Sequence, residues 1–258
     1  MQTRFAFGSC LFFLGTHMPN WLGLWPVPLF VSRRRLAPRR SLPRALAPWA
    51  LDSGGFTEIK MHGRWATSMA TYIEEARRFA NEIGNLRWAA IQDWMCEPKM
   101  LERTGLSVPE HQRRTIRSYL DLRSAAPDIP WTPVLQGWER DDYLRHADDY
   151  ASAGVDLASV PIVGVGSVCR RQHSAEAADI FRSLSRRGLR LHGFGVKLKG
   201  LEIAASSLTS SDSMAWSFAA RRRPPMPGCT HLSCANCQRF ASGWREQVLS
   251  IPGVVGEA

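Results

Sequence analysis

Four polar side chains of this sequence follow apolar, strand-like runs at the points where those runs end. They are Asp52, Asp93, Gln136 and Asp212. In a parallel β-barrel such positions meet at one rim, the carboxyl end of the strands, where the active sites of that fold lie. Carboxylates there can act as nucleophiles or as general acids and bases. Any one of these residues alone could be a helix cap or a loop residue, so it is their combination that indicates a site.

Glycines gather at the same strand ends. A glycine at a strand end lets a flat ligand approach the backbone closely. The set comprises Gly54, Gly55, Gly137, Gly164, Gly166, Gly193 and Gly195. Together with the polar residues, these glycines predict a pocket that accepts a flat ligand.

A second group of chemically active residues lies near the end of the sequence. Cys229, His231, Cys234 and Cys237 occur within residues 229–237, whereas the remaining cysteines are scattered. This clustering favours a metal over disulfides, and such ligands suit tetrahedral Zn²⁺ in a closed, structural site. Two alternatives remain open: a histidine elsewhere could replace His231 as a ligand, or the cysteines could simply be buried.

The elements that must position these residues alternate along the chain. Apolar, strand-like runs cover 11–15 and 28–32, and further runs end within 51–56, 88–94, 131–138, 159–167, 190–197 and 210–216. Amphipathic helices are expected at 69–83, 109–124, 141–153 and 175–187. Repeated strand-then-helix units imply parallel strands with right-handed crossovers. We therefore expect an α/β protein, a compact (β/α)₈ TIM barrel; a doubly wound open sheet is the alternative.

Length and composition agree with one such barrel over residues 1–258, with the cluster at 229–237 inside it. The chain has 258 residues, of which 45% are hydrophobic, and this excludes disordered, collagen-like and coiled-coil classes. The 33 Lys and Arg against 23 Asp and Glu give a formal net charge of +10. A polyanionic partner is consistent with that charge, as is a merely basic surface.

The aromatic-rich start of the chain raises the question of a membrane segment. Polar residues, glycine and prolines interrupt the stretch 5–30, so no clean run of apolar residues is long enough to span a bilayer. The basic start and cleavage site of a signal peptide are also poorly matched. We expect a cytoplasmic protein with no membrane partner.

Six motifs occur in an order that resembles a known family. LDSGGF, IQDW, VLQGW, GVG, HGFGV and SSDS resemble the tRNA-guanine transglycosylase superfamily, which includes queuine tRNA-ribosyltransferases, over roughly residues 48–245. Further details, such as QDWMCEP, GVGSVCRR and DSMAWS, look closest to the short branch associated with deazapurine modification of DNA. The resemblance implies a zinc-bearing (β/α)₈ barrel that exchanges guanine for a 7-deazaguanine in a polynucleotide. The short segment after the cysteine cluster leads us to expect no appended RNA-binding domain.

The resemblance also implies roles for single residues. Asp212 corresponds to the nucleophile that attacks C1′ of the sugar, and Asp52 to a second essential carboxylate usable for proton transfer. Asp93 corresponds to the acceptor for the N–H edge of the base. The remaining base-pocket positions are Gln136, Gly137, Gly164, Gly166 and, as a stacking ring, Phe56. Trp94, Trp138 and Trp216 could each stack on a base or belong to the core.

The metal pattern departs from the family. The family has Cys-x-Cys-x₂-Cys and a distant histidine, whereas this sequence has His231 at the position of the second cysteine. His231 could replace that cysteine as a ligand, with Cys237 replacing the remote histidine, or a histidine elsewhere could complete the set. The implied cofactor is structural Zn²⁺.

Basic runs at Arg170–Arg171 and Arg221–Arg223 flank the expected rim and suit DNA phosphates, although solvated loops are an equal alternative. The leading interpretation is a pentosyltransferase that inserts a free 7-deazaguanine into DNA. The alternatives are the same reaction on tRNA, a hydrolytic glycosidase, and a non-catalytic nucleic-acid-binding module.

Overall fold

The computed structural model describes residues 9–169, 171 and 174–257. Its strands are all parallel and run in the order β5-β4-β3-β2-β1-β9-β8-β7-β6, with β10 paired to β1. The strands are β1 (Cys10–Thr16), β2 (Leu29–Ser32), β3 (Trp49–Asp52), β4 (Leu86–Ala90), β5 (Trp131–Thr132), β6 (Val134–Leu135), β7 (Val163–Val165), β8 (Leu191–Gly193), β9 (Ser210–Ser213) and β10 (Val254–Val255).

The two ends of this strand order are consecutive in the chain, and this closes the sheet. Only Pro133 separates β5, which pairs with β4, from β6, which pairs with β7. Proline has no backbone N–H and interrupts a ladder, yet the carbonyl of Pro133 still accepts a hydrogen bond from Gly164 N at 2.8 Å. β5 and β6 therefore share one strand position, and the nine barrel strands fill the eight positions of the predicted (β/α)₈ barrel.

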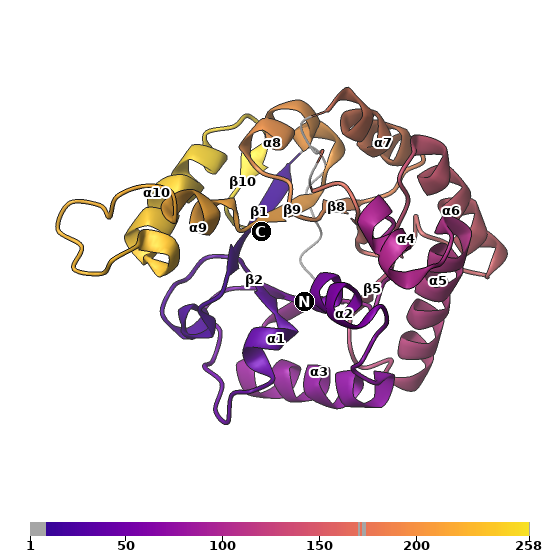
Figure 1. The fold of residues 1–258 in the computed structure, drawn as a ribbon, viewed down its shortest axis with the longest axis horizontal. Helices are drawn as coiled ribbons and strands as arrows, with labels where there is room; N and C mark the ends of the chain where they lie inside the picture. Colours follow the sequence, from indigo (N-terminus) through magenta and orange to yellow (C-terminus); the bar gives the residue numbers. More distant parts are fainter. Residues whose placement is uncertain (1–8, 170, 172–173, 258) are drawn as a thin grey trace.

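Helices surround the strands, as Figure 1 shows. The outer helices are α3 (Met69–Ile83), α5 (Val108–Ala125), α6 (Arg140–Ser152), α7 (Ala175–Arg186), α8 (Leu198–Ala204) and α10 (Gln238–Leu249). The four helices predicted from the sequence are confirmed to within a residue at each end. Ser68, Ser107 and Ser174 begin three of them, because each hydroxyl accepts the N–H three residues later.

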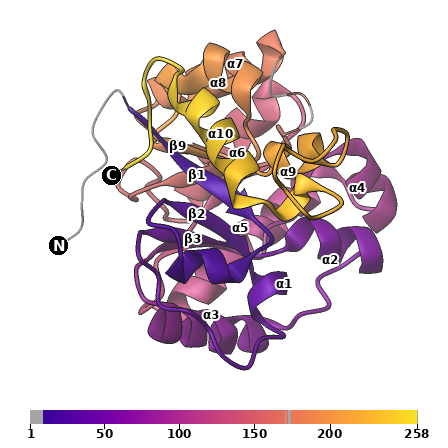
Figure 2. The same ribbon diagram turned by 90° about the vertical axis from the view of Figure 1, so that its left-hand side faces the viewer.

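Shorter helices and turns carry the loops between strands and outer helices. They are α1 (Arg33–Leu36), α2 (Gly55–His62), α4 (Pro98–Thr104), α9 (Ala215–Ala220) and the 3₁₀ turns η1 (Pro19–Gly23), η2 (Ala205–Ser207) and η3 (Cys234–Asn236). In Figure 2, α1, α2, α4 and α9 lie along the same side of the molecule. This is the side to which the strands point their carboxyl ends.

Alternation along β1 shows how the core is divided. Phe12 and Leu14 belong to the large cluster between strands and helices, whereas Leu11 and Phe13 belong to a cluster inside the barrel. Trp88 lies in the interior with its ring centroid 4.6 Å from that of His192. Aromatic side chains thus fill the barrel interior beneath the rim. No helix among the described residues has the length and apolarity needed to cross a membrane.

Candidate active site at the carboxyl end of the barrel

A cavity of about 530 Å³ opens at the carboxyl end of the strands. Asp52, Asp93, Gln136 and Asp212, the four polar residues predicted from their strand-end positions, all line it. Its volume lies within the range of ordinary small-ligand sites. The prediction that these residues converge is therefore confirmed by the structure.

Asp212 is in β9 and is almost fully buried. Its Oδ1 accepts a hydrogen bond from Gly195 N at 2.9 Å and lies 3.3 Å from His192 Nε2. His192 Nδ1 is in turn 2.8 Å from Ser210 Oγ. These contacts fix the orientation of the Asp212 carboxylate at the cavity wall.

Asp52 ends β3 and sits in a tight turn. Its Oδ1 accepts a hydrogen bond from Gly54 N at 3.1 Å. Gly54 has φ of +80°, and a Cβ there would meet Arg34 Cγ at 2.9 Å, so both conformation and space require glycine. Burial raises the pKa of Asp52, and the nearby negative charge of Asp212 acts in the same direction, against hydrogen bonds from Ser32 and Gly54.

Asp93 lies in the loop after β4 and belongs to a buried polar network. Gln136 Nε2 donates to Asp93 Oδ2, and Gln136 Oε1 lies 2.7 Å from Ser167 Oγ. Ser167 Oγ is also 3.0 Å from Glu97 Oε2, so its single proton can serve only one of these two acceptors at a time. Burial raises the pKa of Asp93 to about 7, with smaller effects from Asp52 and Glu97.

The predicted base-pocket glycines fall into two groups. Gly166 lines the cavity, and a Cβ on it would overlap the Gln136 amide. Gly137 instead packs against Asp142 and Tyr143, and Gly164 against the Phe194 ring, and neither borders the cavity. The absence of a side chain at Gly137 and Gly164 thus allows neighbouring side chains to pack closely against these strands.

The aromatic candidates also separate. Phe56, in the first turn of α2, lines the cavity. Trp216 is buried against Trp21 with its Nε1 donating to Gly15 O at 2.8 Å, and Trp94 is buried with Arg114 4.6 Å from its ring centroid. Trp138 borders a neighbouring hollow instead of this cavity.

Sequence reasoning missed several cavity residues. His17 follows β1, and Arg34 and Arg35 follow β2 in α1, so all three obey the same strand-end rule. Both arginines stand in the arginine-rich stretch 33–40, a composition typical of a solvated surface, and for that reason the sequence alone did not single them out. Burial lowers the pKa of His17, and the positive charges of Arg35 and Arg221 act in the same direction.

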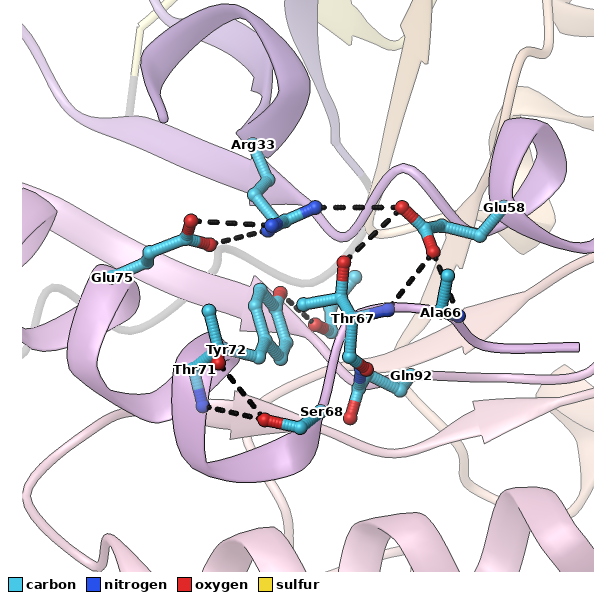
Figure 3. Close-up of polar contacts among 10 residues, drawn as sticks. Arg33, Glu58, Ala66, Thr67, Ser68, Thr71, Tyr72, Glu75 and Gln92 are labelled. Atoms are coloured by element: carbon cyan, nitrogen blue, oxygen red, sulfur yellow. Dashed lines mark hydrogen bonds and ion pairs between the residues drawn. The ribbon is translucent and has the colours of Figure 1, made fainter. Parts of the chain in front are cut away.

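Arg33, the first residue of α1, has a different role from its two neighbours (Figure 3). Its Nη2 donates to Glu75 Oε1 of α3 at 3.1 Å, and its Nη1 lies 3.6 Å from Glu58 Oε1 of α2. Glu58 Oε2 also accepts hydrogen bonds from Ala66 N at 3.0 Å and Thr67 N at 3.1 Å. This network ties α1 to α2 and α3, and so holds Arg34 and Arg35 at the cavity.

The predicted phosphate-binding arginines are placed differently from one another. Arg221, Arg222 and Arg223 follow α9 and are exposed, with the Arg222 guanidinium 3.8 Å from the Phe218 ring centroid. The Arg171 side chain is only 13% exposed, because it packs on Trp138 and donates to the Trp138 carbonyl. Arg170 lies outside the described residues.

The ligand atoms of Cys229, His231, Cys234 and Cys237 lie within 4.8 Å of one another. Cys229 Sγ is 4.0 Å from both Cys234 Sγ and Cys237 Sγ, and His231 Nε2 is 3.2 Å from Cys234 Sγ. Zn–S bonds of about 2.3 Å in a tetrahedron would separate two sulfurs by about 3.8 Å. Three thiols and one imidazole at these separations could hold a metal ion such as zinc, and the compact arrangement includes His231.

Comparison with known proteins agrees with this architecture. A search of the curated proteins found no match. A scan against protein families matched residues 9–256 to DpdA, described as deoxypurine in DNA protein A. Because this match covers nearly the whole chain, the protein belongs to the DpdA family, a deazapurine DNA-modification family related to the tRNA-guanine transglycosylases.

Proposed function

We propose that the protein is a pentosyltransferase that replaces guanine in DNA with a 7-deazaguanine derivative. The carrying observation is that Asp52, Asp93 and Asp212, from three separate strand ends, face one cavity. Membership of the DpdA family supports DNA as the polynucleotide.

In the first step, an oxygen of Asp212 attacks C1′ of the target deoxyribose. The C1′–N9 bond breaks through an oxocarbenium-like transition state, and its electrons leave with guanine, which takes a proton. Asp52 is suited to give that proton, because its pKa is higher than that of an ordinary carboxyl group and the protonated form is therefore more populated.

In the second step, the incoming 7-deazaguanine loses the proton from its N9 to Asp52 and attacks C1′ from the opposite face. The C1′–O bond to Asp212 breaks, and the carboxylate is regenerated. Two displacements at the same carbon retain its configuration, and no water enters the product. Gly195 N donates to Asp212 Oδ1 and His192 Nε2 lies 3.3 Å from the same oxygen, so both contacts hold the Asp212 side chain in position at the start and at the end of the cycle.

Base recognition belongs to the network on the other side of the cavity. Guanine and 7-deazaguanine share an edge with N–H donors and a carbonyl acceptor. Asp93 can accept from the N–H groups, and the Gln136 amide can reach the carbonyl. Phe56 supplies an apolar ring at the cavity wall. We assign packing roles to Gly137 and Gly164, because neither borders the cavity.

Zinc would be held by Cys229, His231, Cys234 and Cys237. A four-ligand site has no open position, so the ion would stabilise the segment after α9 and would take no part in the exchange.

The test is nucleoside mass spectrometry after incubation of the protein with DNA, or separately with tRNA, and an isotopically labelled 7-deazaguanine. We expect label in DNA from the wild type and none from Asp212→Asn, and intact-protein mass spectrometry should detect a wild-type protein–DNA adduct that Asp212→Asn cannot form. Asp149→Asn, on exposed α6 surface, is the matched control and should retain exchange. Label in DNA with the Asp212→Asn variant, or label confined to tRNA, would refute the proposal.

A further inference from the structure

A second hollow of about 490 Å³ adjoins the cavity. Phe56 and Glu97 line both, so the two spaces are neighbours. The second hollow lies between α2 and α4, which contact each other near the barrel opening (Figure 1). Its other polar and aromatic lining residues are Lys60, Lys99, Arg103 and Trp138. None of these belongs to the exchange chemistry described above.

Trp138 is held firmly at the edge of this hollow. Its backbone N donates to Asp142 Oδ2 at 3.0 Å, at the start of α6. The Arg171 guanidinium lies 4.2 Å from the indole centroid, and Arg171 also donates to the Trp138 carbonyl. Arg171 itself does not border the hollow. The indole is therefore fixed before any ligand arrives, which lowers the entropic cost of stacking on it.

The charge of the hollow is positive. Lys60, Lys99 and Arg103 face a single acidic residue, Glu97. Arg103 is occupied, since it donates to the carbonyls of Lys60 at 3.1 Å and Met61 at 2.7 Å and so ties α4 to the end of α2. Lys60 and Lys99 are exposed, and neither forms an ion pair with another described residue. The chain has only four lysines beside its many arginines, and two of them border this one space.

A fixed aromatic ring beside free ammonium groups matches the two halves of a nucleotide, a flat base and a phosphate. We propose that the hollow binds a nucleotide next to the target in the same DNA strand, with its base stacked on Trp138 and its phosphate between Lys60 and Lys99. This inference rests on the proposed function only in taking DNA as the substrate. The contiguity of the two spaces supports this proposal. When the target nucleotide occupies the cavity, the chain connects it to a neighbouring nucleotide, which must lie next to the cavity, where the second hollow is.

The consequence is that two adjacent bases leave the helical stack together. Extruding a base costs unstacking energy, and an aromatic platform for the neighbour offsets part of that cost. The enzyme should therefore bind single-stranded or locally melted DNA more tightly than intact duplex.

The test uses single-stranded oligonucleotides that carry one target guanine and an abasic residue on its 5′ or 3′ side. Wild-type affinity should fall roughly 5- to 150-fold for one of the two abasic positions, the range for loss of one stacked base. Trp138→Ala should bind the intact oligonucleotide more weakly than the wild type does, by a similar factor. Its affinity for the abasic oligonucleotide should be no lower than its affinity for the intact one. Trp138→Phe should restore most of the sensitivity. An equal abasic penalty in wild type and Trp138→Ala, or none in wild type, overturns the stacking assignment.

A second variant addresses the phosphate and guards against loss of folding at Trp138. Lys60→Ala/Lys99→Ala should lower the slope of log affinity against log salt by about 0.7 for each single-strand phosphate that the variant no longer neutralises. Lys199→Ala, an exposed lysine of α8 that borders neither space, should leave the slope unchanged. An unchanged slope in the double variant overturns the phosphate assignment. Both tests measure DNA binding, so their results can be interpreted even if the protein does not catalyse base exchange.

Discussion

Three aspartates in one cavity are distinguished by their surroundings. Asp212 is held by the Gly195 amide and lies beside His192. Asp52 closes a turn through Gly54 and has a raised pKa. Asp93 is paired with Gln136, and burial raises its pKa to about 7. Carboxylates held in such different surroundings can divide nucleophilic, acid–base and binding roles among themselves.

The raised pKa of Asp93 predicts a pH dependence of stability. The pKa is about 7 in the folded protein against an ordinary 3.8, so between these pH values the folded state keeps a proton that the unfolded chain has released. The contribution of Asp93 to stability therefore falls as pH rises from about 4 to about 7 and levels off above that. Asp93→Asn cannot titrate, so the free energy of unfolding of the variant relative to wild type should rise across this window, by about 1.4 kcal/mol per unit of pKa difference.

Denaturant titrations of both proteins at several pH values measure this difference. Asp149→Asn, an exposed substitution of the same chemistry, provides the control and should track the wild type. A constant difference between Asp93→Asn and wild type across the window would contradict the raised pKa.

Strand-end position was enough to predict Asp52, Asp93, Gln136 and Asp212 as cavity residues. It could not reveal that Gly137 and Gly164 turn toward Tyr143 and Phe194, because those contacts join segments distant in the sequence. The adjacent residues Arg33 and Arg34 show the same limit. Arg33 forms ion pairs with Glu58 and Glu75, whereas Arg34 lines the cavity. The packing of α1 determines this difference, and the sequence does not show it.

At the scale of elements, α1 depends on that ion-pair network. Arg33 is largely buried between α2 and α3, so Arg33→Met should leave Glu58 and Glu75 without their cation and lower the free energy of unfolding by about 3 kcal/mol. Displacement of α1 should also weaken DNA binding, because Arg34 and Arg35 move with it. Thermal melting and DNA affinity test this, with exposed Arg40→Met as control. Equal melting temperatures for the two variants would contradict an anchoring role.

The cysteine segment supports a second element, α9, which follows the strand of Asp212. Ser217 Oγ of α9 donates to Ala235 O of η3 at 2.7 Å, and Met226 N donates to Cys234 Sγ at 3.3 Å. We expect about one Zn²⁺ per purified chain. Cys234→Ala or chelation should increase the rate of amide hydrogen exchange in α9 and η3. Either change should slow the replacement of guanine in DNA less than Asp212→Asn does.

Elemental analysis and hydrogen-exchange mass spectrometry check the metal prediction. Cys169→Ala, a change of cysteine away from the cluster, should leave both metal content and protection unaltered. Protein prepared without chelators that lacks zinc would refute it.

At the scale of the whole molecule, the alternation of strands and helices was sufficient to predict the barrel, and the order of six motifs was sufficient to predict its family. The manner of closure was not predictable, since Pro133 divides one strand position between two pairings that only the folded sheet brings together. The second hollow was equally hidden, because α2 and α4 meet through tertiary contacts. Sequence periodicity reports the faces of single elements, whereas closure and cavities arise between elements.

The formal net charge of +10 raises the question of which arginines meet DNA. Arg221–Arg223 are exposed beyond α9, and Arg221 lies near enough to His17 at the cavity to lower its pKa, whereas Arg171 is packed on Trp138. Replacing all three arginines of the run with Ala should weaken DNA binding and reduce its salt slope by roughly 0.7–0.9 for each phosphate that is no longer neutralised. Affinity for a free 7-deazaguanine should not change.

The matched control is the triple variant Arg117→Ala/Arg123→Ala/Arg186→Ala. Its three arginines lie on the outer helices α5 and α7, and their replacement removes the same charge as replacement of Arg221–Arg223. Titrations of DNA and of free base across a salt series separate the two proteins. If the run at 221–223 binds phosphate, its variant alone has the shallower slope, because counterion release depends on contacts and not on net charge. If both triple variants flatten the slope equally, the effect belongs to the overall charge of the protein, and a specific DNA path from α9 to the cavity is ruled out.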